Sequence, residues 1–221
     1  MVIYSFARSK MMILRDTAIT WSIICSNLIN CIAISNSSGS AQDQGFFNCI
    51  NLVDCSSTCT CTNINTHGFS GCNRLINCDA SSPSGGNCFS GCNYLTNCIG
   101  VGVDSAFDSC TYLTNCNGTS TSAAGASSTF TGCSSLTNCI GVATGGGGNA
   151  GSAFYNCTGL TLCSGQGLNP GAGPGYGFNG CHKMQQNKAG AASKTATYNA
   201  SYADAGSGNA CADTAAGGYN S

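Results

Sequence analysis

Hydrophobic positions recur along the chain in blocks of Phe-x-x-Cys-x-x-Leu-x-x-Cys, clearest at Phe89–Cys98 (FSGCNYLTNC). Apolar residues three apart lie on one side of about one helical turn, and a period of three fits a tight 3₁₀-like turn better than an α-helix. After the Leu, the pattern becomes Thr-Asn-Cys-Ile-Gly-Val at 96–101 and 137–142. This second pattern predicts a short extended segment whose side chains alternate between two faces.

The block repeats from Cys25 to Cys181, with successive first cysteines 24, 23, 20, 18, 23, 24 and 24 residues apart. Blocks that recur within the chain and are separated by Gly/Ser/Ala-rich loops of variable length predict a stacked solenoid. The predicted core contains the Phe, Cys, Leu and second Cys of the central units. These residues are Phe69, Cys72, Leu75, Cys78, Phe89, Cys92, Leu95, Cys98, Phe107, Cys110, Leu113, Cys116, Phe130, Cys133, Leu136, Cys139, Phe154, Cys157, Leu160 and Cys163.

The predicted fold class is a single-domain, leucine-rich-repeat-like solenoid. We expect short parallel strands along one side, short helical or 3₁₀ turns, and Gly-rich loops. Residues 25–187 form about eight repeats of 18–24 residues, and residues 188–221 form a C-terminal cap or flexible tail. Residues 1–24 are expected to form an N-terminal cap. A signal-like segment is the alternative, because an uncharged stretch runs over 17–34, although polar residues interrupt it.

The low content of charged residues limits the classes of partner that the protein can bind. Charged residues make up 7% of the chain, the formal net charge is −1, and no Glu is present. So few charges give no electrostatic basis for binding nucleic acid or an anionic membrane. We therefore expect no nucleic-acid partner and no membrane insertion.

The pattern resembles the BspA-type leucine-rich repeats, whose core reads Ala-Phe-x-x-Cys-x-x-Leu-x-x-Ile. Ala153–Cys163 (AFYNCTGLTLC) and Ala106–Cys116 (AFDSCTYLTNC) carry the resemblance most closely. This chain departs from the family by placing Cys at the Ile position and glycine where the family has Pro. The resemblance implies surface-exposed adhesion or recognition proteins of bacteria, their phages and some protozoa, without catalysis.

The cysteines raise the question of metal or disulfide chemistry. Fifteen of the 19 occupy two fixed positions of the repeat, which indicates packing as small buried apolar residues. Cys55, Cys59 and Cys61 with His67 form the best metal candidate, but their spacing fits no recognised zinc pattern. We expect no metal and no cofactor. The cysteines off the columns are expected to pair or to be exposed: Cys59, Cys61, Cys88 and Cys211.

The sequence predicts no enzyme. Nucleophilic catalysis needs a base beside the nucleophile and a third group that orients the base. The only histidines are His67 and His182, and neither has an acid nearby in the sequence.

The outer face of the strands is the candidate ligand surface. The second residue after each second Cys is always small, so we expect these residues to face a narrow core. The other positions would face outward: Asn97, Ile99, Val101, Asn115, Asn117, Thr119, Asn138, Ile140 and Val142. Asn77, Asn97, Asn115 and Asn138 could instead form a structural ladder of hydrogen-bonded amides. A second candidate is a C-terminal tip with Tyr198, Tyr202 and Tyr219 among small residues.

Together these features favour a non-catalytic recognition or adhesion protein, a cell-surface or phage-fibre adhesin. Its partner would be a protein or glycan on a cell surface, and its location extracellular, on the cell surface or on a virion. The alternative is a structural spacer or a self-assembling fibre element without a ligand, and this alternative includes a homo-oligomer.

Overall fold

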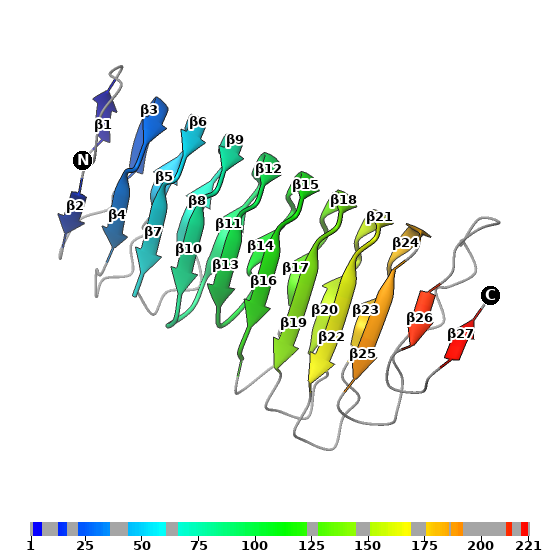
Figure 1. Cartoon of the computed structure of the whole chain (residues 1–221). Coiled ribbons are helices and arrows are strands. Elements are labelled where there is room, and N and C mark those ends of the chain that lie inside the picture. The colour runs from blue at the N-terminus through cyan, green and yellow to red at the C-terminus, as the bar shows by residue number, and fades with distance from the viewer. Residues whose placement is uncertain are drawn as a thin grey trace.

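The computed structural model describes residues 2–5, 13–16, 22–35, 44–60, 66–122, 128–144, 151–168, 176–185, 187–191, 211–213 and 218–220. Within these ranges every regular element is a β-strand. Correspondingly, no helix in the described part of the chain is long and apolar enough to cross a membrane. The chain winds as a parallel β-solenoid with its termini at opposite ends (Figure 1). The prediction of a repeat solenoid is therefore confirmed.

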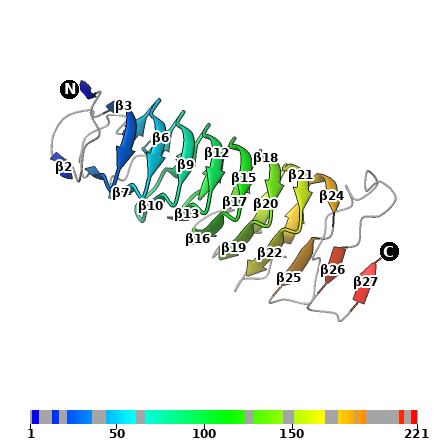
Figure 2. The ribbon, with the colours of Figure 1, turned by 45° about the horizontal axis from the view of Figure 1, so that its top comes forward.

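The coils build three parallel sheets, which we call A, B and C in the order in which the chain visits them. Sheet A contains β5 (Gln44–Phe47), β8 (His67–Ser70), β11 (Asn87–Ser90), β14 (Phe107–Asp108), β17 (Ser128–Thr131), β20 (Ser152–Tyr155) and β23 (Tyr176–Asn179). Sheet B contains β6 (Ile50–Val53), β9 (Asn73–Ile76), β12 (Asn93–Thr96), β15 (Thr111–Thr114), β18 (Ser134–Thr137), β21 (Thr158–Thr161) and β24 (His182–Gln185). Figure 2 shows the sheet B strands side by side.

Sheet C extends furthest along the axis. It contains β2 (Ile13–Asp16), β4 (Ile32–Ser35), β7 (Ser56–Cys59), β10 (Asp79–Ser82), β13 (Ile99–Gly102), β16 (Asn117–Ser120), β19 (Ile140–Thr144), β22 (Ser164–Leu168), β25 (Lys188–Ala191), β26 (Cys211–Asp213) and β27 (Gly218–Asn220). β3 (Ser22–Ile29) joins sheets A and B, because it pairs with β1 (Val2–Ser5), β5 and β6. The described parts of 188–221, the segment expected to be a cap or tail, thus add strands to sheet C, and the last pair is antiparallel.

Each corner that precedes a column cysteine contains one residue whose backbone dihedral angles lie in the left-handed region. The residue before each described column cysteine after Cys25 has a positive φ, for example Gly91 (60°) before Cys92 and Asn97 (54°) before Cys98. Asn and Gly tolerate this conformation better than other residues, which explains the recurring Asn-Cys and Gly-Cys pairs. Further left-handed residues lie at the second position of the sheet B strands, such as Tyr94 (56°).

The prediction of helical or 3₁₀ turns is wrong, because the described elements are strands. The prediction of strands along one side only is also wrong, because three sheets surround the core. The period of three arises because each left-handed residue resets the alternation of an extended chain. One residue then points inward, the next outward, and the third turns the backbone. Thus Phe89 on sheet A, Cys92 at the corner and Leu95 on sheet B all point inward. A helical turn would give the same spacing in the sequence.

Equivalent residues stack in register along the axis. Phe89 pairs with Phe107, Leu95 with Leu113, and Gly100 with Gly118. The phenylalanine rings form a continuous stack from Phe46 to Phe178, with centroids 4.7 to 5.0 Å apart. All twenty residues predicted for the core are buried. Stacked aromatic pairs add to the stabilisation that burial alone provides.

The core between sheets A and C is narrow, as the small residues after the second Cys predict. Gly100, Gly118 and Gly141 point inward against sheet A. A Cβ atom on Gly141 would lie 3.1 Å from the Ala153 carbonyl oxygen and 3.2 Å from Phe130 Cδ2. This strand position therefore has room for small side chains only, and other coils hold Ala33, Ser57 and Ala80 there.

The two cysteine columns serve as hydrogen-bond donors at the corners. In the first column, Cys92 Sγ donates to the Phe69 carbonyl of the preceding coil at 3.5 Å. In the second, Cys98 Sγ donates to the Leu75 carbonyl at 3.7 Å. Cysteine fits these positions because it is a small apolar residue that still carries a weak donor.

Asn187 also donates a hydrogen bond to a carbonyl of the preceding coil, but from an amide in place of a thiol. It stands where the second cysteine of its unit is expected, is buried, and donates from Nδ2 to the Leu160 carbonyl at 3.1 Å. Its Oδ1 also accepts the backbone N–H of Cys163 at 2.7 Å. Asn187 thus ends the thiol column and satisfies two buried backbone groups at once.

We predict that Asn187→Ala lowers the free energy of unfolding by roughly 2–4 kcal/mol, because it leaves both backbone groups without partners. Asn187→Cys keeps a donor to Leu160 and should lose less than half as much. Urea unfolding followed by far-UV circular dichroism measures both changes. Equal losses in the two variants would contradict the donor role of this column.

Candidate functional site

The two cysteine columns are the most conspicuous set of potentially reactive side chains, but their burial indicates a role in packing. No group of three potential metal ligands occurs among the described residues. Column thiols such as Cys72, Cys110 and Cys133 are free and fully buried. Burial raises the pKa of all three thiols, because it disfavours the thiolate. A thiol held in this form is a poor metal ligand and a poor nucleophile.

The off-column cysteines Cys59 and Cys88 are also buried, so the expectation that they are exposed or paired is wrong for Cys88, whose thiol is free. Both side chains take inward positions on strands, where the core surrounds them. Cys59 Sγ donates to the His67 carbonyl at 3.4 Å. The remaining members, Cys61 and the side chain of Cys211, lie outside the described part of the structure, so the proposed cluster with Cys61 does too.

The asparagines of the predicted ligand face form the ladder that the alternative reading predicts. Asn97 Nδ2 donates to Asn77 Oδ1 at 3.2 Å, Asn115 donates to Asn97 at 3.2 Å, and Asn138 donates to Asn115 at 2.9 Å. The ladder continues from Asn77 to Asp54 Oδ1 at 3.0 Å. These residues turn the chain between sheets B and C, so their amides stabilise the stack.

The other predicted face residues lie on the outer side of sheet C. Ile99, Asn117 and Ile140 occupy equivalent positions on β13, β16 and β19. Val101, Thr119 and Val142 form a neighbouring column on the same strands. Ile99, Val101 and Ile140 are 44–47% exposed, so this flat surface carries uncovered apolar side chains. The structure brings these six residues together on sheet C, whereas the asparagine ladder lies at the corner that precedes these strands.

The predicted tyrosine tip lies mostly outside the described residues. Tyr198 and Tyr202 are not among them, and Tyr219 lies within β27, for which only the backbone is described.

His67 and Asp108 are titratable groups on sheet A. Burial is the main cause that lowers the pKa of His67 and raises the pKa of Asp108. They lie on β8 and β14, which are separated by β11. Two strand spacings correspond to about 9.6 Å, which is too far for a direct proton transfer between them.

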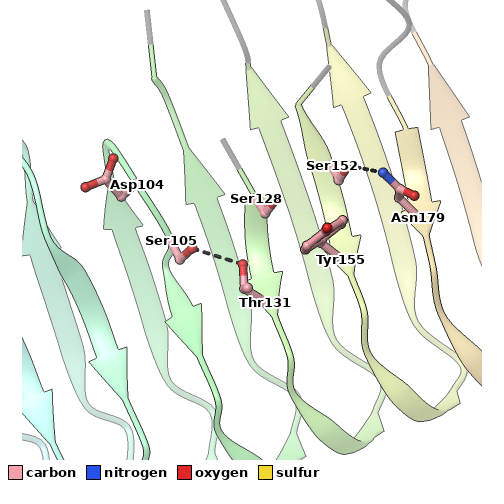
Figure 3. A pocket seen from close by; sticks show the side chains of 7 residues that line it. All are labelled: Asp104, Ser105, Ser128, Thr131, Ser152, Tyr155 and Asn179. Carbon is pink, nitrogen blue, oxygen red and sulfur yellow. Dashed lines mark hydrogen bonds between the residues drawn. The ribbon is translucent and has the colours of Figure 1, made fainter. Parts of the chain in front are cut away.

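A groove of about 380 Å³ runs across the outer side of sheet A. Its lining comes from three neighbouring strands, β17, β20 and β23, and from the segment before β14 (Figure 3). The lining residues are Asp104, Ser105, Ser128, Thr131, Ser152, Tyr155 and Asn179. Most of these residues begin or end a sheet A strand, so register stacking brings together side chains about two dozen residues apart in the chain.

Hydrogen bonds hold the lining in place. The hydroxyls of Ser105 and Thr131 lie 3.0 Å apart, and Asn179 Nδ2 donates to Ser152 Oγ at 3.4 Å (Figure 3). Asp104 Oδ2 accepts the Gly86 backbone N–H at 3.0 Å. Tyr155 stands between these pairs with 39% of its surface exposed. The groove therefore offers hydroxyls, an amide and one aromatic ring, with a single carboxylate at its edge.

No protein family, curated protein or solved structure matches this chain. The geometry of the groove and of the outer faces therefore carries the functional argument.

Sequence reasoning missed the groove. A signal for it does exist, because the residue after each Phe is mostly polar: Ser70, Ser90, Asp108, Thr131, Tyr155 and Asn179. The helical interpretation of this segment concealed it, since these residues form one outward column only when the segment is a strand.

We predict that the free energy of unfolding falls as the pH rises above about 8.5, the usual pKa of an unfolded thiol. Burial raises the pKa of Cys88 to about 12. Between these values the unfolded chain loses a proton that the folded protein keeps, so alkali favours unfolding by up to about 1.4 kcal/mol per pH unit for each such thiol. Urea unfolding from about pH 7 to about pH 10 measures the slope.

The matched control is Cys88→Ala, because Ala106 occupies the equivalent position on the next coil. This variant should show a shallower slope than the wild type. Stability independent of pH over this range would contradict the picture of protonated, buried thiols.

Proposed function

We propose that this protein is a non-catalytic recognition or adhesion protein whose sheet A groove binds a neutral glycan. The observation that carries the proposal is the lining of the groove. Four aliphatic hydroxyls, a phenol and an amide suit a ligand rich in hydroxyl groups. One exposed tyrosine ring suits the apolar face of a sugar.

The scaffold supports this function. Residues that line the groove are held by strands in register, so little conformational entropy is lost when a ligand binds. The proposal also retains the function implied by the resemblance to BspA-type leucine-rich repeats, and an extracellular, cell-surface or virion location follows as part of it. The low overall charge agrees with a neutral partner.

The test is a glycan-array and cell-binding assay with Tyr155→Ser and Asn179→Ser. Serine is found in the same outward column at Ser70 and Ser90, so both variants should fold. We expect each substitution to weaken binding about tenfold through loss of ring contact or of the amide hydrogen bond. Gln166→Ala, an exposed change on sheet C, should leave binding unchanged. Equal binding by all variants would place the ligand elsewhere.

A second candidate is self-assembly through the outer side of sheet C, favoured by the exposed Ile99, Val101 and Ile140. Ile99→Asn with Ile140→Asn tests it, because Asn117 already occupies the same column between them. If the face associates, multi-angle light scattering should show wild-type mass growing with concentration and the variant remaining monomeric. A monomeric wild type at all concentrations would rule out this candidate.

A further inference from the structure

One column on sheet B departs from the residue types that its backbone favours. The second residue of these strands has a positive φ: Asn51 (59°), Arg74 (61°), Tyr94 (56°), Tyr112 (57°), Ser135 (58°), Gly159 (70°) and Lys183 (53°). Asn and Gly adopt this conformation at low cost, whereas a bulky side chain there is strained. Arg74, Tyr94 and Tyr112 are therefore residues of types that the local backbone disfavours. Strain of this kind concentrates at functional sites.

The two tyrosines are stacked and exposed. Their ring centroids are 4.8 Å apart with an interplanar angle of 8°. Tyr94 is 52% and Tyr112 53% exposed. A pair of large aromatic side chains held rigidly in solvent contributes little to the core, but it is well suited to bind a flat ligand.

The aromatic stack ends abruptly after Tyr112. The next two positions of the column hold Ser135 and Gly159, so the stack gives way to small residues. We call this place, formed by Tyr112, Ser135 and Gly159, the tyrosine step. The face of the Tyr112 ring that points away from Tyr94 looks over the step.

Hydroxyl groups border the step on both sides. Thr114, Thr137 and Thr161 form one in-register column, and Thr111, Ser134 and Thr158 form the other. All six side chains are exposed or half-buried. The residues that form the step and line its two sides are uncharged. Lys183 borders one end, in register with Gly159, and Arg74 lies beyond Tyr94 at the other end.

We propose that the tyrosine step is a second glycan-binding site, in which one sugar ring stacks on Tyr112 above Ser135 and Gly159. The ring continues the tyrosine stack, and its hydroxyls hydrogen-bond to the threonine and serine columns. A nucleic-acid base would also stack, but its phosphates need several cations, whereas the side chains that line the step are uncharged and Lys183 lies at one end. A neutral polysaccharide therefore fits better.

This inference rests on the proposed function only in treating the protein as a glycan-recognition protein. The groove lies on sheet A and the tyrosine step on sheet B, so the two sites are separable by substitution.

The experiment is affinity electrophoresis of the full chain in native gels that contain hydroxyethyl cellulose, glycol chitin, xyloglucan or dextran. We expect at least one polysaccharide to retard the wild type. Tyr112→Asn should weaken this binding about tenfold or more, while Tyr112→Phe should retain most of it. Tyr112→Asn should also match or exceed the wild type in thermal stability, since Asn51 occupies the same column.

Ser135→Tyr is the decisive variant, because it extends the stack and fills the step. It adds an exposed aromatic ring, yet it should abolish binding at this site. Stronger binding by Ser135→Tyr would show a non-specific aromatic contact and overturn the inference. Retardation by none of the four polysaccharides, or binding of single-stranded oligothymidylate instead, would also overturn it.

The groove variant Tyr155→Ser separates this inference from the proposed function. Binding lost in Tyr112→Asn but kept in Tyr155→Ser would support the step and count against the groove. The reverse result would overturn the step and leave the groove proposal standing.

Discussion

The structure depends on the left-handed corner residue followed by an inward cysteine. A corner must reverse the alternation of an extended chain and also satisfy the carbonyl groups that leave the sheets there. Asn or Gly provides the turn, and the cysteine thiol of the next coil provides the donor, as with Gly91, Cys92 and the Phe69 carbonyl. Because each corner uses the coil before it as acceptor, a single coil has no complete set of partners. Stacking is therefore required for stability.

The same constraint explains what could be predicted from the sequence. The repeat, the buried Phe, Cys and Leu columns, the narrow core at Gly141 and the ladder at Asn97 all follow from residues that recur at equivalent positions. The spacing of three predicts helical turns where the structure has strands, because inward positions three apart have two physical origins. The Asn or Gly before most of the column cysteines is the signal that distinguishes them.

The same reasoning did not predict the groove, although the polar residue after most of the phenylalanines is a signal for it. Thr131, Tyr155 and Asn179 are unlike one another and far apart in the chain, and only the register of sheet A brings them together. The resemblance to leucine-rich repeats concerned the same three apolar residues that a three-sheet solenoid uses, so it could not define the cross-section of the coil.

Outward positions are where this fold is free to vary, since the corners and the core permit few residue types. The cysteines belong to the restricted set and Tyr155 belongs to the free set, whereas Tyr94 and Tyr112 occupy left-handed positions that favour Asn or Gly. A departure from the type that a column favours is thus more informative about function than the repeated motif itself.

The central claim is that the segment from Phe to Leu in each unit is extended and turns at left-handed residues. Nuclear Overhauser spectra of the isotopically labelled protein over 107–113 test it directly. The account predicts strong sequential Hα–HN contacts, together with methyl contacts that connect Leu113 to Leu95 and Leu136. Contacts from each residue to the third residue after it, typical of a helical turn, would contradict it.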